Sequence, residues 1–243
     1  MTKAAAATAA LPTHASDADP GSAAPLLYDD RREQQYRKPT MRGWQHLVWF
    51  IASVGVNGYV LGQVHGDLRL TGFAIYAATV SGLFGTSALY HRGDWSPRAS
   101  AVLQRADHTM IFFLIAGSAT PEFLFALPGA TGKLAVAAVW TLTISLTVTH
   151  LCWMNAPERL VGGAFILLGW GAAAGLPAVW INFGVAPAVL IVAGGVLYTA
   201  GAICYHRRSP DPRPTVFGYH EVFHAFVCAA ATCHYVAITI FLL

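Results

Sequence analysis

Charged residues are scarce in this chain, which has little material for a water-facing surface. Only 11% of the 243 residues are charged, whereas about 25% is usual for a soluble domain. Hydrophobic residues make up 55% of the chain. This composition argues against an ordinary soluble enzyme and favours a protein whose solvent is the lipid bilayer.

The sequence also shows no C-x-x-C pair, and its first residues do not look like a secretory leader. The four cysteines lie in or at the ends of apolar segments, and none forms a C-x-x-C pair. We interpret them as small buried hydrophobic residues and expect no disulfide framework. Residues 1–25 do not show the basic start and apolar run that are typical of a cleaved signal peptide. Their content of Ala, Pro, Ser and Thr predicts a disordered tail instead.

Long apolar segments fill the rest of the chain. A hydrocarbon core about 30 Å thick needs roughly 20 apolar residues for each helical crossing. Seven such segments follow residue 43, so we predict an all-α membrane protein with a seven-transmembrane helix bundle over residues 43–243. Residues 1–42 form a disordered and basic juxtamembrane tail in this prediction. The expected helices are Trp44–Gln63, Leu70–His91, Asp107–Leu127, Lys133–Trp153, Leu160–Trp180, Val185–Tyr205 and Tyr219–Leu243.

The basic residues indicate how the bundle is oriented. If the N-terminus is cytoplasmic, 13 of the 15 Lys and Arg residues lie on the inside, and only Arg69 and Lys133 lie outside. Cytoplasmic loops of membrane proteins are enriched in Lys and Arg, so we predict a cytoplasmic N-terminus and an external C-terminus. The formal net charge of +3 therefore reports topology, and no nucleic-acid partner is expected.

Histidines gather at the predicted cytoplasmic ends of three helices. His220 and His224 are four residues apart, which places them on one helical face about 6 Å apart. This is the spacing at which two imidazoles on one helix bind zinc. His91 is the best placed third ligand. The main rival is His108, but it follows Asp107 directly in the sequence, so its side chain points about 100° away from that of Asp107 around the helix. Three imidazoles leave a fourth position open, as in catalytic zinc sites.

Two further polar residues share this leaflet, and each has a second interpretation. Asp107 can hold a water at the metal, or it can pair with Arg105 or cap the N-terminus of its helix. Ser87 lies one turn before His91 and can donate to a substrate oxygen, or its hydroxyl can bond its own backbone.

The remaining histidines are interpreted as packing or interfacial residues. His234 is about 15 Å beyond His224 along the same helix, too far to share the metal. The same interpretation applies to His46, His65, His150 and His206. Residues 220–224 also spell H-E-x-x-H, in which the Glu of zinc proteases is the general base. Glu221 is therefore either a catalytic base of an intramembrane protease or a first-turn acid favoured by the helix dipole.

The set of motifs resembles a known family. Ser87-x-x-x-His91, Asp107 and His220-x-x-x-His224, in this order, are similar to the haemolysin III group. This group is the bacterial branch of the progestin and adipoQ receptor family, which includes the adiponectin receptors. The stretch Gly117-Ser-Ala-Thr-Pro121 also resembles the third helix of the family, and the resemblance covers roughly residues 35–243.

The resemblance implies a zinc ion held by His91, His220 and His224, with Asp107 as the acid beside it and Ser87 next to the site. It also implies hydrolysis of a lipid amide or ester, because the adiponectin receptors look like ceramidases, and it implies a bacterial inner membrane location. A membrane lipid is then the expected substrate, and no protein partner is indicated. The main alternative is a non-enzymatic membrane regulator that zinc stabilises, and a less favoured one is the metalloprotease.

Overall fold

The computed structural model describes residues 27–29, 34–153 and 157–243. The chain divides into two units, residues 1–38 and residues 39–243. In the first unit, strand β1 (Leu27–Asp29) pairs antiparallel with strand β2 (Gln34–Tyr36), with Tyr28 opposite Gln35. The sequence did not predict this hairpin. The predicted disorder of residues 1–25 lies outside the described residues.

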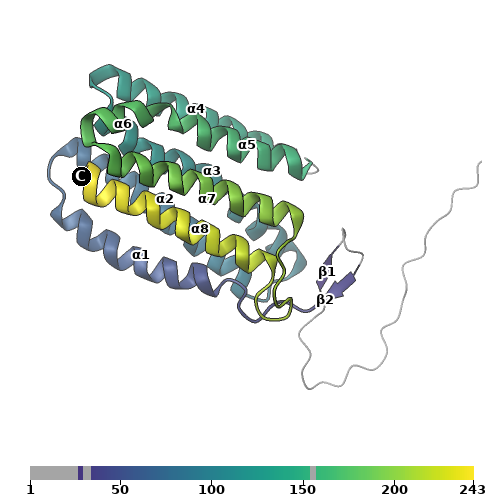
Figure 1. Ribbon diagram of the computed structural model, residues 1–243. Helices are drawn as coiled ribbons and strands as arrows, with labels where there is room; N and C mark the ends of the chain where they lie inside the picture. Colours follow the sequence, from purple (N-terminus) through teal and green to yellow (C-terminus); the bar gives the residue numbers. More distant parts are fainter. Residues whose placement is uncertain (1–26, 30–33, 154–156) are drawn as a thin grey trace, which may run out of the picture. The chain divides into compact units, whose positions relative to one another are not determined.

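The second unit is a bundle of helices (Figure 1). Its α-helices, in chain order, are α1 (Trp44–Gln63), α2 (Asp67–Arg92), α3 (Pro97–Ala126), α4 (Gly129–Cys152), α5 (Glu158–Ala172), α6 (Leu176–Phe183), α7 (Val185–Arg207) and α8 (Tyr219–Val236). A 3₁₀ turn (Ala173–Gly175) joins α5 directly to α6, and a π-helical stretch (Ala237–Leu242) extends α8. The described residues therefore form seven helical segments, which confirms the prediction of an all-α membrane bundle.

Six of these segments in the described part of the chain are long and apolar enough to cross a membrane. The exception is α1, whose 20 residues are sufficient for a crossing about 30 Å long but are less apolar. Its buried side chains are all polar: His46, Ser53 and Asn57. The sides of α1 that face its neighbours α2 and α8 therefore supply polar contacts. Partly buried apolar residues of α1, such as Trp49 and Phe50, pack beside them, whereas Val48 and Ile51 are exposed.

Large apolar side chains cover the outside of the bundle. Leu134 on α4, Leu167 on α5 and Ile181 on α6 are 69%, 76% and 79% exposed. Such exposure over several neighbouring helices is costly in water and costs nothing in lipid tails. The side of the membrane that each terminus faces stays a prediction.

The third helix begins ten residues earlier than expected, and the predicted loop Arg92–Ala106 was wrong. The Ser96 side chain accepts a hydrogen bond from the Ala99 amide, and Pro97 occupies the first helical turn. A Ser cap followed by Pro starts a helix without any apolar run. Asp107 thus lies inside α3, so its alternative role as the helix cap was also wrong.

The two central helices, α2 and α3, pack closely. A Cβ atom added to Gly117 of α3 would lie 2.7 Å from the Cβ of Thr79 on α2. Small residues allow such close approach in membranes, where van der Waals packing drives helix association. This contact fixes α2 against α3, and these two helices carry His91 and Asp107.

Candidate metal centre

Three helices deliver ionisable side chains to one end of the bundle. His91 lies in the last turn of α2, Asp107 lies in α3, and His220 and His224 lie in the first turns of α8. His91 and His224 are 6% and 2% exposed. The structure therefore brings the five residues singled out in the sequence, including buried Ser87 of α2, to the same end of the bundle.

The three imidazoles are close enough to share one ion. One ligand nitrogen of each of His91, His220 and His224 lies within 4.8 Å of the others. The Nε2 atoms of His91 and His220 are 3.3 Å apart. Zinc–nitrogen bonds of 2.0–2.1 Å at tetrahedral angles place two ligand nitrogens about 3.3 Å apart, so this separation suits a shared ion.

One nitrogen atom of the cluster has no hydrogen-bond partner within the described residues and is available to bind a metal. The Nδ1 atom of His224 is buried and has no hydrogen-bond partner within the described residues. An unpartnered buried polar atom is costly, and a ligated ion removes that cost. Neutral imidazoles in a buried, closely spaced group of three are the usual donor set of zinc, so the residues present fit this metal.

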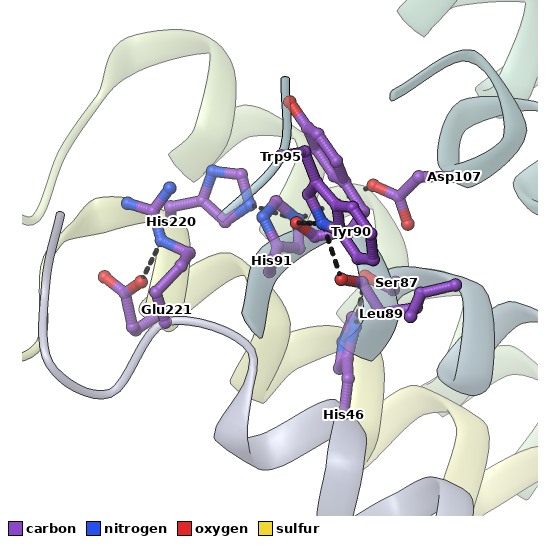
Figure 2. Close-up of polar contacts among 10 residues, drawn as sticks. His46, Ser87, Leu89, Tyr90, His91, Trp95, Asp107, His220 and Glu221 are labelled. Atoms are coloured by element: carbon purple, nitrogen blue, oxygen red, sulfur yellow. Dashed lines mark hydrogen bonds and ion pairs between the residues drawn. The ribbon is translucent and has the colours of Figure 1, made fainter. Parts of the chain in front are cut away.

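Asp107 lies on the other side of His91 from His220, as Figure 2 shows. One of its carboxylate oxygens is 3.5 Å from His91 Nε2. Its side chain is 15% exposed, whereas that of His91 is 7% exposed. The acid is thus beside the imidazole cluster, where it can hold a hydrogen-bond donor such as a water molecule.

Glu221 is directed away from the three clustered histidines. It is fully buried, and its Oε1 atom accepts a hydrogen bond from the Arg42 guanidinium, which lies just before α1. Its Oε2 atom is 2.8 Å from the Gly218 amide, which donates to it at the N-terminus of α8. Both carboxylate oxygens therefore have structural partners, and the alternative of a first-turn acid describes this residue.

We expect Glu221→Gln to lower the free energy of unfolding by about 1.5–3 kcal/mol, because it removes a charge-assisted hydrogen bond from a buried site. Denaturant unfolding of the detergent-solubilised protein measures this change. Asp67→Asn is the matched control, since Asp67 is also a first-turn acid but is exposed on α2. Equal stability of the two variants would contradict the structural role of Glu221.

The other histidines lie apart from the ligand set, with one exception. His234 is 3.3 Å from Glu122, and the ring centroids of His108 and His150 are 6.0 Å apart. The exception is His46, whose ring stacks on that of His224 with 3.7 Å between centroids. The sequence interpretation of His46 as an ordinary packing residue did not foresee its contact with the cluster.

Arg42 and Glu122 were also missed as partners. The Arg42–Glu221 pair could have been found from the sequence, since both charges lie at the predicted cytoplasmic boundary of their helices. The Glu122–His234 pair could not, because it depends on how α3 and α8 are rotated. An acid within an apolar segment nevertheless indicates a buried partner, and Glu122 is indeed only 4% exposed.

The chain matches one family model and several individual proteins over most of its length. Residues 34–235 match the family described as Haemolysin-III related. "Hemolysin-3" of Bacillus cereus is 26% identical over 198 residues, which cover 79% of this chain and 87% of that protein. "Heptahelical transmembrane protein ADIPOR2" of Oryza sativa subsp. japonica is 33% identical over 162 residues, which cover 60% and 71%.

A more distant relative has a much longer chain. "Adiponectin receptor protein" of Drosophila melanogaster is 24% identical over 214 residues, which cover 79% of this chain and 48% of that protein. The haemolysin III match extends from just before α1 into α8 and includes every helix that contributes to the histidine cluster. The chain is therefore a membrane protein of the Haemolysin-III related family.

Proposed function

We propose that this protein is a zinc-dependent hydrolase of a lipid amide or ester, with the metal held by His91, His220 and His224. The observation that carries the proposal is the buried cluster of three imidazole nitrogens within 4.8 Å, with an acid beside it. Three imidazoles leave one tetrahedral position for water or substrate, which separates catalytic from purely structural zinc sites.

Zinc, Asp107 and Ser87 have different roles in the proposed hydrolysis. Zinc, when bound, lowers the pKa of water towards 7 and polarises a carbonyl group. Asp107 is placed to accept the proton of the attacking water and to return it to the leaving group. Ser87 lies one turn before His91 and adds a hydroxyl group to the polar side chains of the site. Burial excludes bulk water, which strengthens each of these electrostatic interactions.

The location of the site inside a membrane bundle favours a lipid as the substrate. The site lies within a bundle whose exterior is apolar, so the molecules that surround the protein at this depth are lipids. The expectation of a ceramide-like amide comes from the resemblance to the adiponectin receptors. The proposed orientation, with a cytoplasmic N-terminus, puts the site at the inner leaflet of the bacterial inner membrane.

A second candidate is a membrane regulator that zinc stabilises without catalysis. The observation that favours it is that the ligands come from α2 and α8, so a bound ion ties the two helices together. The intramembrane protease has less support, because the general base it requires, Glu221, is bonded to Arg42 and Gly218.

The proposal is tested with the purified protein in lipid nanodiscs and a fluorescent short-chain ceramide together with its ester analogue. We expect release of the fatty acid from one of the two, loss of the activity after treatment with a zinc chelator, and recovery on adding zinc. A protein that binds zinc but releases no fatty acid from either lipid would favour the regulator over the hydrolase.

A further inference from the structure

A fourth histidine lies against the candidate metal centre without belonging to the ligand set. His46, in the first turn of α1, is 3% exposed. Its ring is parallel to that of His224 within 14°, at a centroid distance of 3.7 Å. Its Nδ1 atom is 2.8 Å from Ser87 Oγ, a contact that Figure 2 also shows. One imidazole of α1 therefore contacts both α2 and α8 at the site.

The hydrogen bond between His46 and Ser87 can form with either group as the donor. A serine hydroxyl both donates and accepts, and a neutral imidazole has one donor and one acceptor nitrogen. In either arrangement the bond holds the His46 ring against α2, one turn before His91.

We infer, on the basis of the proposed function, that His46 is a positioning residue of the metal centre. It supports the ring of the ligand His224 by stacking, and its hydrogen bond to Ser87 fixes it against α2, one turn before His91. Ser87 then serves as the partner of His46 rather than as a donor to a substrate oxygen. The metal centre therefore extends to α1, which contributes no ligand to it.

The expected effect of losing this support is measurable. Removing a residue that orients a metal ligand typically costs about 10–100-fold in metal affinity or activity. The two contacts of His46 can be separated by substitution. His46→Phe keeps a ring against His224 and removes the nitrogen that bonds Ser87, whereas His46→Asn keeps a hydrogen-bonding group in place of Nδ1 and removes the ring.

The experiment uses the full-length protein loaded with cobalt(II), whose visible absorption reports the geometry around the metal. We expect His46→Asn to weaken metal binding about 10–100-fold, because His224 loses its support. His46→Phe should keep metal affinity within a few-fold of the parent. It should change the cobalt spectrum in the same way as Ser87→Ala, and the double variant should change it no further, since residues in one chain of hydrogen bonds are coupled.

His65→Phe is the control, because His65 is exposed in the loop between α1 and α2. The inference is overturned if the His46 variants have the affinity and spectrum of this control, or if the spectral changes of His46→Phe and Ser87→Ala add. A parent protein that binds no metal overturns the proposed zinc function as well. Comparing His46→Phe with Ser87→Ala decides the matter even if His46→Asn does not fold.

Discussion

Replacing both His220 and His224 by alanine should reduce the zinc content of the purified protein from on the order of one ion per chain to none. The variant keeps one imidazole ligand, His91, and a single imidazole does not hold zinc against washing. Metal binding also stabilises the folded state, by about 4 kcal/mol when the free metal concentration is a thousand times Kd. Added zinc should therefore raise the melting temperature of the parent protein and leave that of the variant unchanged.

The control for this double substitution is His65→Ala, which removes a histidine that is exposed and distant from the cluster in sequence. Elemental analysis of protein purified in detergent gives the metal content of all three proteins, and circular dichroism shows that they retain their helices. A well-folded parent protein without metal would contradict the zinc site. The cluster would then be a set of packing groups.

Changing Asp107 to asparagine should leave zinc bound and lower the rate of lipid hydrolysis by about 10²–10⁴-fold. Asparagine has nearly the shape of aspartate and can still form hydrogen bonds, but it cannot accept a proton from the attacking water. The three imidazole ligands are unchanged, so the metal content should match that of the parent. Fatty-acid release and zinc content, measured on the same preparation, separate the two effects.

Asp67→Asn serves as the control, since the exposed Asp67 is at the start of α2, whereas His91 lies in the last turn of that helix. Full activity of Asp107→Asn would show that another group takes the proton. Loss of zinc from this variant would instead make Asp107 a ligand, with four protein donors and no open position for a substrate.

The helical segments of the fold were predictable because lipid demands long apolar runs, and α1 even has the predicted bounds, Trp44–Gln63. Departures occur where helices extend beyond the apolar runs. Residues 97–106 of α3 are helical because Ser96 and Pro97 start the helix, not because they are buried. The expected helix Leu160–Trp180 contains a 3₁₀ turn among small residues, and apolar content alone gives no sign of it.

The candidate site was predictable to a different extent. His91, Asp107, His220 and His224 could be placed together because topology fixes the depth in the membrane at which each apolar segment begins or ends. The part played by His46 was not predictable, because it depends on the rotation of α1 about its axis. The depth of a residue in the membrane can be found by counting apolar residues along its helix. The rotation of a helix about its axis is instead set by side-chain packing between helices that are far apart in sequence.

The first and last helices of the bundle also constrain how the protein is made. Side-chain pairs join α1, or Arg42 just before it, to α8, and they include Arg42 with Glu221, His46 with His224, and Asn57 with Tyr235. During synthesis α1 enters the membrane long before α8 exists, so its polar groups lack these partners until translation is nearly finished. The contacts between the two ends of the chain therefore form only after α8 has been made, and a chain that stops before α8 lacks all of them.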